Sequence, residues 1–256
     1  MSISIILPTL NEVQSISIII NDLRVYFPKN ENEIIVVDDN SVDGTQLLIS
    51  KLALEDNSLK LIERKTEIDG LPGAIFRGIT ESRYETVAWM DADGSMPAST
   101  LSYLAKKYEN SNQIIVGSRF IPGGGFKGIS DESRNVFKVW KNLRNSSDSF
   151  LAVVLSRGLN ILLRILLRHG IKDYTSGFVV CAKSTALKVG LFGVYGDYCP
   201  KFLFTAASMG FDIIEVPYLN LPRKHGTSKS GTNLFQLCKR GFPYVTSAIK
   251  LSFKRR

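Results

Sequence analysis

Short apolar runs alternate with helical patterns through the first half of the chain, and this alternation constrains the fold more than any other feature. The run Ile34–Val37 contains only β-branched residues, which suit burial on both faces of a parallel sheet. Ile16, Ile20 and Leu23 have the spacing of an amphipathic helix. Strands that alternate with helices over short connections predict an α/β fold, with a mostly parallel central sheet flanked by helices.

Periodicity and turn residues assign the elements along the chain. Strands are expected at residues 3–7, 33–37, 59–62, 86–90, 113–117, 178–181 and 212–216. Helices are expected after residue 16, at 45–55, between 70 and 83, and at 98–108, 134–143, 150–168, 183–189, 200–209 and 233–253. The most apolar helix, 150–168, could lie in a membrane interface or pack on the sheet as a core helix.

The composition excludes several classes of protein. With 32 basic and 24 acidic residues, the formal net charge is +8, which suits an anionic membrane surface or a phosphorylated substrate. Nucleic acid is not expected as a partner because no motif of that class occurs, and the G-x-G-x-x-G dinucleotide fingerprint is absent after the first strand. We expect no signal peptide and no membrane-spanning helix, and the three scattered cysteines indicate free thiols in a reducing compartment.

Two carboxylates, Asp91 and Asp93, directly follow the apolar run 86–90. In an extended chain, residues two apart point the same way, so both could project from the end of a strand. Such a pair repels itself unless a cation lies between the carboxylates, and Mg²⁺ or Mn²⁺ suits that position. The alternative is an ordinary strand-to-helix turn, in which Asp93 or Ser95 caps the helix that Pro97 opens.

Polar residues follow other strands in the same way. Pro8 to Glu12 come after the first strand, and Asp38 and Asp39 come after the second. Together with Asp91 and Asp93 they would line the carboxyl edge of the sheet, where open α/β sheets bind ligands. The carboxylates of Asp38 and Asp39 could accept hydrogen bonds from a ribose or a base. Turn and helix-capping chemistry is the alternative for residues 39–45.

Six motifs occur in a fixed order: Pro8–Glu12, Val36–Thr45, Met90–Pro97, Gly117–Phe120, Thr175–Phe178 and Glu215–Lys229. This set resembles the motifs of glycosyltransferase family 2, and most of all those of its dolichol-phosphate mannose synthase group, the polyprenyl-phosphate glycosyltransferases. The resemblance covers residues 3–231.

The resemblance implies a GT-A (Rossmann-like) fold, a GDP- or UDP-sugar donor, Mg²⁺ or Mn²⁺, and transfer of a hexose such as mannose or glucose with inversion. The donor would be bound by Pro8, Glu12, Asp38, Asp39, Asp91, Ala92, Asp93 and Lys229. The metal would lie at Asp93 and Asp91, with Ser95, which stands where many members have Gln, as the third candidate. The catalytic set would be Asp91, Asp93, Arg119 and Arg223, and the acceptor phosphate would meet Arg119, Arg157 and Ser228.

Three hypotheses about the function are open, and the first two differ in the acceptor. A polyprenyl phosphate is already ionised near neutral pH and needs orientation more than a base. A glycan or small hydroxyl acceptor would need a general base, for which His225 is the one histidine placed in a motif. The third hypothesis is a non-catalytic nucleotide-sugar-binding module, and the intact Asp91 and Asp93 count against it.

The domain organisation follows from the same motifs. We expect one GT-A domain over residues 1–231, with a nucleotide-binding half at 1–118 and an acceptor-side half at 119–231. Residues 232–256 would form a basic amphipathic tail that can rest on anionic lipid. The expected location is therefore cytoplasmic and peripheral, at a membrane surface or on a membrane-protein partner.

Overall fold

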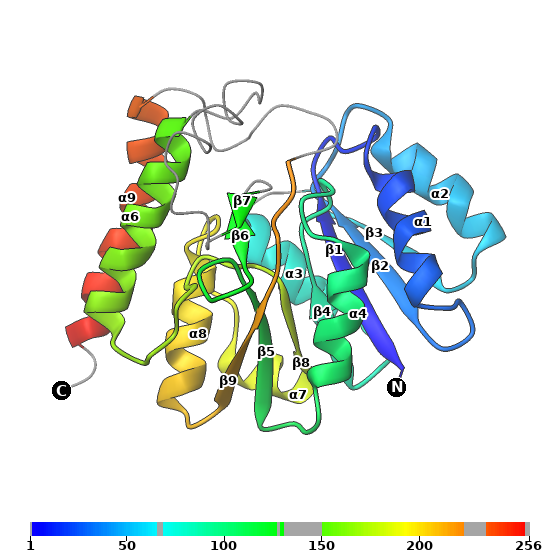
Figure 1. Ribbon diagram of the computed structural model, residues 1–256. Coiled ribbons are helices and arrows are strands. Elements are labelled where there is room, and N and C mark those ends of the chain that lie inside the picture. Colours follow the sequence, from blue (N-terminus) through cyan, green and yellow to red (C-terminus); the bar gives the residue numbers. More distant parts are fainter. Residues whose placement is uncertain (1, 66–68, 127–128, 131–149, 223–233, 254–256) are drawn as a thin grey trace.

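The computed structural model describes residues 2–65, 69–126, 129–130, 150–222 and 234–253 (Figure 1). A seven-stranded sheet forms the centre, in the order β3-β2-β1-β4-β8-β5-β9. Its strands are β1 (Ile3–Thr9), β2 (Glu33–Asp38), β3 (Leu59–Glu63), β4 (Thr86–Trp89), β5 (Gln113–Ser118), β8 (Val179–Ala182) and β9 (Asp212–Pro217). Only β8 runs antiparallel to its neighbours, β4 and β5. The predicted α/β class with a mostly parallel sheet is confirmed.

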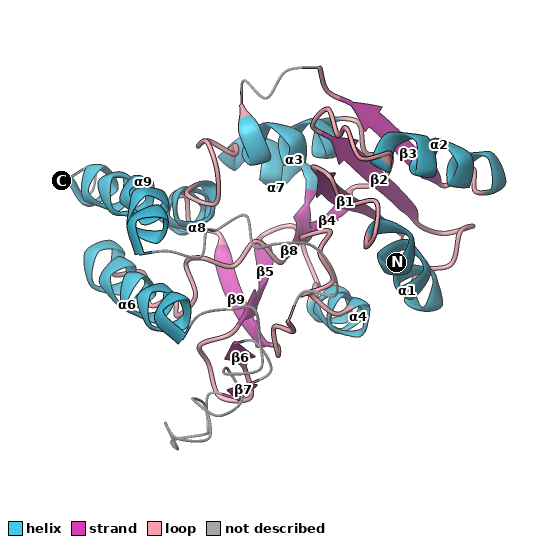
Figure 2. Ribbon diagram, turned by 90° about the horizontal axis from the view of Figure 1, so that it is seen from above, coloured by secondary structure: helices cyan, strands magenta, loops and turns pink. Residues whose placement is uncertain are grey.

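Helices cover both faces of the sheet (Figures 1 and 2). They are α1 (Ile16–Tyr26), α2 (Thr45–Glu55), α3 (Gly70–Thr80), α4 (Ala98–Lys107), α6 (Phe150–Leu167), α7 (Lys183–Val189), α8 (Tyr198–Ser208) and α9 (Leu234–Phe253). Side chains alternate along each strand, so Ile5 and Leu7 of β1 pack in one cluster with α1 and α4, whereas Ile6 packs in the other with α3, α7 and α8. Two apolar cores therefore sandwich the sheet.

The first strand ends later than the sequence predicts. β1 continues past Leu7 and includes Pro8 and Thr9. Its pairing with β4 ends at Ile6, whereas its pairing with β2 continues to Thr9. Backbone groups alternate sides along a strand, so the missing N–H of Pro8 faces the side where pairing with β4 has ended. Proline is tolerated there because no ladder hydrogen bond is lost.

The C-terminal helix packs against the rest of the domain. α9 lies beside α6 and also contacts α8 (Figures 1 and 2). Ala248 of α9 is fully buried, and the Tyr244 hydroxyl occupies the space beside Gly196, at the turn before α8. A boundary at residue 231 stays a prediction. Among the described residues, no helix is both long enough and apolar enough to cross a membrane.

One further difference concerns the middle of the chain. A short hairpin, β6 (Gly125–Phe126) and β7 (Ile129–Ser130), was not predicted, because strands this short carry no periodic signal. The predicted helix at 134–143 lies outside the described residues.

Candidate active site

The candidate site lies at one edge of the sheet, the upper edge in Figure 1. All strands except β8 end there, because they run parallel to one another. The loops that follow β1, β2, β4, β5 and β9 therefore meet at this edge. They carry most of the residues predicted from the sequence.

The loop after β4 places the two aspartates in a turn. β4 ends at Trp89, so strand alternation does not aim Asp91 and Asp93, and that part of the prediction is wrong. Asp93 is 5% exposed, and its Oδ1 accepts the N–H of Ser95 at 2.9 Å. Gly94 has a φ of 79°, which favours glycine at this turn. Helix α4 starts after Pro97 without a side-chain cap, so the capping alternative is not supported.

One side of this loop is attached to α1. The Ser15 hydroxyl lies 3.0 Å from the carbonyl oxygen of Ala92 and 2.9 Å from Glu12 Oε2. Ser15 directly precedes α1 and is 1% exposed. This contact brings Glu12 and Ala92 together, two residues that the sequence assigned to the donor.

The other side of the loop is attached to the segment after β9. The carbonyl oxygen of Ser95 accepts the Leu221 N–H at 2.8 Å and the Asn220 side-chain amide at 3.3 Å. This segment ends at Pro222 and leads into residues 223–233. The predicted site residues Arg223, Ser228 and Lys229, and also His225, lie outside the described residues.

Asp38 is the centre of a hydrogen-bond network at the end of β2. Its carboxylate is fully buried and accepts four hydrogen bonds, from Thr9 Oγ1 at 2.9 Å, Ser41 N at 2.8 Å, Ser41 Oγ at 2.6 Å and Gln46 Nε2 at 2.7 Å. These contacts tie β1, the loop after β2 and α2 together. The predicted contact of Asp38 with a nucleoside remains a prediction.

The neighbouring carboxylate, Asp39, pairs with a residue that the sequence analysis missed. Its Oδ1 lies 3.0 Å from Nη1 of Arg64, which follows β3 and also donates to the carbonyl oxygen of Gly70 at 3.0 Å. The sequence could have indicated Arg64 as a site residue, because Arg64 directly follows a strand, as other predicted site residues do. Pro8, at the end of β1, is half-buried at the same edge.

Arg119 follows β5 and forms a buried ion pair with Asp173. The guanidinium donates from Nε to Asp173 Oδ2 at 2.8 Å and from Nη2 to Oδ1 at 2.9 Å. Burial alone would disfavour both charges, but Arg119 lowers the pKa of Asp173, and Asp173 raises the pKa of Arg119. Asp173 was also missed, although it precedes the Thr-Ser-Gly motif. Arg157 is half-buried on α6, outside the strand-end loops.

The buried phenol of Tyr218 is affected by charges from both halves of the site. Burial raises the pKa of Tyr218, the nearby Arg119 charge lowers it, and the charges of Asp173 and Asp91 raise it. Tyr218 also packs edge-on against Phe178, with ring centroids 5.3 Å apart. The charges of Asp91 and of the Arg119–Asp173 pair therefore act on the same phenol.

The described residues fit a metal that is shared with a substrate. Among them, no group of three or more His, Cys, Asp or Glu side chains could hold a metal ion. Mg²⁺ is commonly bound through one or two carboxylates plus substrate phosphates, and Asp91 and Asp93 could supply that number. Ser95 is 6% exposed and its N–H is bonded to Asp93.

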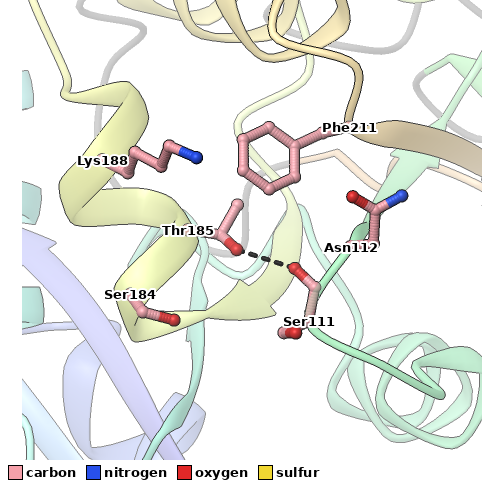
Figure 3. Close-up of a pocket in the computed structure, with 6 residues that line it drawn as sticks. All are labelled: Ser111, Asn112, Ser184, Thr185, Lys188 and Phe211. Atoms are coloured by element: carbon pink, nitrogen blue, oxygen red, sulfur yellow. Dashed lines mark hydrogen bonds between the residues drawn. The ribbon is translucent and has the colours of Figure 1, made fainter.

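A polar hollow at the opposite edge of the sheet is separate from this site. It is lined by Ser111, Asn112, Ser184, Thr185, Lys188 and Phe211 (Figure 3). Thr185 Oγ1 donates to the carbonyl oxygen of Ser111 at 2.8 Å, which holds the start of α7 against the loop before β5. None of the predicted site residues lines it.

Comparison with solved structures supports the fold. Glucosyl-3-phosphoglycerate synthase from Mycobacterium tuberculosis, in complex with Mn²⁺, UDP-glucose and phosphoglyceric acid, superposes with a TM-score of 0.66. The match covers 98% of this chain and 79% of that one at 16% sequence identity. The GT-A fold expected from the sequence is thereby confirmed.

Sequence comparison identifies the family. The polyprenol monophosphomannose synthase of Mycolicibacterium smegmatis is 32% identical over 90% of this chain and 82% of its own length. The undecaprenyl-phosphate mannosyltransferase of Micrococcus luteus is 30% identical over 90% of this chain and 87% of its own length. The pattern of the family "Glycosyl transferase family 2" matches residues 4–183. This chain therefore belongs to glycosyltransferase family 2.

Proposed function

We propose that this glycosyltransferase moves a hexose, mannose or glucose, from a GDP- or UDP-sugar to a polyprenyl phosphate, with inversion at the anomeric carbon. The observation that carries the proposal is the similarity to a polyprenol monophosphomannose synthase and an undecaprenyl-phosphate mannosyltransferase, each matched over 90% of this chain.

The donor would lie across the loops after β1, β2 and β4. Glu12 and Asp39 would face the nucleoside, with Asp38 fixing the loop beside them and Pro8 lining the end of β1. Asp91 and Asp93 would hold Mg²⁺ or Mn²⁺, which offsets the charge that develops on the departing nucleoside diphosphate. Lys229 is proposed to contribute to the same diphosphate.

The acceptor phosphate would approach from the β5–β9 side. An oxygen of the phosphate attacks the anomeric carbon, one carbon–oxygen bond forms, and the bond to the nucleoside diphosphate breaks with inversion. The second pKa of a phosphate monoester is about 6, so no general base is needed at neutral pH. The proposed phosphate contacts are Arg119, Arg157, Arg223 and Ser228.

Transfer in vitro tests the proposal. The purified chain would be incubated with Mg²⁺ or Mn²⁺, labelled nucleotide sugars and a short polyprenyl phosphate. We expect metal-dependent label in the lipid, lost on chelation and in Asp93→Asn, but kept in the control Asp212→Asn, an exposed aspartate at the opposite edge. Donor consumption without labelled lipid would refute the acceptor. No turnover by a folded chain with any donor would refute the catalytic proposal.

We further propose peripheral attachment to a membrane through what we call the α6–α9 face. On α6 its exposed apolar residues are Ile161, Leu162 and Ile165, and on α9 they are Phe242, Ile249 and Phe253. Their spacing forms one stripe along each helix, and the two helices lie side by side (Figure 2). Exposed Arg168 and Lys250 flank the stripes, and basic residues near the surface favour anionic lipid.

Vesicle cosedimentation tests this attachment. We expect binding to vesicles that contain phosphatidylglycerol, weaker binding at high salt, and loss of binding in Ile165→Asp combined with Phe253→Asp. The control Leu54→Asp changes an exposed leucine on α2, and we expect it to bind as the wild type does. Equal binding by both variants would refute the assignment to this face.

A further inference from the structure

The turn Lys172–Thr175 is held by two elements that are distant in sequence. Glu215 of β9 accepts the backbone N–H groups of Lys172 and Asp173 at 2.7 and 2.9 Å. Asn160 of α6 is 2% exposed; its Oδ1 accepts the N–H of Tyr174 at 2.9 Å, and its Nδ2 donates to the carbonyl oxygen of Lys172. The turn is therefore fixed relative to both the sheet and α6.

Asp173 links this fixed turn to Arg119. The carboxylate is fully buried and accepts hydrogen bonds from the Arg119 backbone N–H at 3.0 Å as well as from Nε and Nη2. Nη2 also donates to Thr175 Oγ1 at 2.7 Å. A bidentate pair fixes the plane of a guanidinium, and the extra contacts remove the remaining freedom of this long side chain.

We propose that Asp173 is a positioning residue, which holds the Arg119 guanidinium at the carboxyl end of β5 in the one orientation that meets the acceptor phosphate. This inference rests on the proposed function. Arg119 is suitably placed because it directly follows β5, at the same edge of the sheet as the loop after β4 that carries Asp91 and Asp93.

A second buried ion pair provides a matched control. Arg24 Nε lies 3.0 Å from Asp56 Oδ2, and both side chains are largely buried. Asp56 precedes β3, at the edge of the sheet opposite the candidate site. Loss of either carboxylate leaves an arginine without its buried partner, but only Asp173 is proposed to act on the reaction.

The experiment compares Asp173→Asn, Asp56→Asn, Arg119→Gln and the double variant Arg119→Gln/Asp173→Asn. Thermal midpoints, nucleotide affinity with Mg²⁺, and kcat and KM for a short polyprenyl phosphate would be measured at a temperature where all are folded. Asparagine places an amide against one guanidinium nitrogen, so Arg119 must turn. Misplacement of a reacting group can cost about 100-fold, and we expect a fall of that order in kcat/KM for the acceptor.

The expected pattern separates positioning from folding. Nucleotide affinity stays unchanged in Asp173→Asn, and Asp56→Asn keeps wild-type transfer. The double variant recovers the thermal midpoint that Asp173→Asn alone loses, but it transfers no better than Arg119→Gln. Wild-type acceptor kinetics in folded Asp173→Asn would overturn the inference alone, as would losses that multiply in the double variant. A wild-type chain that transfers nothing to a phosphate acceptor would overturn the proposed function and this inference with it.

Discussion

Asp38 gives the sharpest test of how the edge of the sheet is built. Replacement by alanine removes an acceptor that is fully buried and engaged by four donors. Hydrogen bonds to charged groups typically contribute about 1.5–3 kcal/mol each. Ser41 and Gln46 are half-exposed and can turn to water, whereas the buried Thr9 hydroxyl cannot. We therefore expect the free energy of unfolding to fall by about 3 kcal/mol rather than by the full sum.

The variant Asp38→Asn separates folding from binding. The asparagine side chain keeps one acceptor oxygen, so we expect a loss of about half that size, about 1.5 kcal/mol. For a chain of this length, a loss of about 3 kcal/mol lowers the thermal midpoint by about 6–12 °C. Urea denaturation gives the free energy, and titration calorimetry gives nucleotide affinity in Mg²⁺.

The outcome that refutes this reasoning is specific. An alanine variant within about 0.5 kcal/mol of the wild type would show that the network does not stabilise the fold. An asparagine variant of wild-type stability that has lost nucleotide binding would instead assign Asp38 to direct contact with the donor. The control Asp212→Ala changes an exposed aspartate, and we expect no effect on stability or binding.

Three further predictions concern packing, pH and thiol reactivity. Gly78→Ala should lower the free energy of unfolding by about 1–3 kcal/mol in urea titrations, because the new methyl group would lie 2.6 Å from Ile6 Cγ2; a more stable variant would contradict this. Folding lowers the pKa of Asp173. Its stabilising contribution is therefore present above its ordinary pKa of about 3.9 and is lost as the pH falls through the lower folded value. In acid titrations, Asp173→Asn should lose less free energy of unfolding over that range than the wild type does. Cys181 and Cys199 are buried and their thiol pKa values are raised, so a thiol reagent should label them only in denaturant, and rapid labelling of either in the native chain would refute their burial.

Much of the fold could be predicted because its signals are local. The helix expected at 45–55 is α2 (Thr45–Glu55), and the one at 183–189 is α7 (Lys183–Val189). The antiparallel direction of β8 carries no local signal. Its residues are buried on both faces, as those of a parallel strand would be, and its direction depends on pairing with two strands distant in sequence.

The candidate site could likewise be predicted only where its signals are local. The positions of Asp38 at the end of β2 and of Asp91 and Arg119 after β4 and β5 follow from motifs and periodicity. The partner of Arg119 does not, because Asp173 lies 54 residues further along the chain. No spacing rule connects residues so far apart. Sequence reasoning therefore found the residues at the edge of the sheet but missed the contacts that orient them.

Hydrogen bonds from two sides explain how the turn that carries Asp93 can serve as a site although it lies outside the sheet. The carbonyl oxygen of Ala92 is held from α1 by Ser15, and that of Ser95 is held from the end of β9 by Leu221. Each hydrogen bond contributes only about 1 kcal/mol. Their value lies in geometry, since reactive groups must be held to within about 0.5 Å. Asp93 lies between the two attachment points, and its Oδ1 accepts the Ser95 N–H at 2.9 Å, so these contacts hold its carboxylate without the side chains of Asp91 or Arg119.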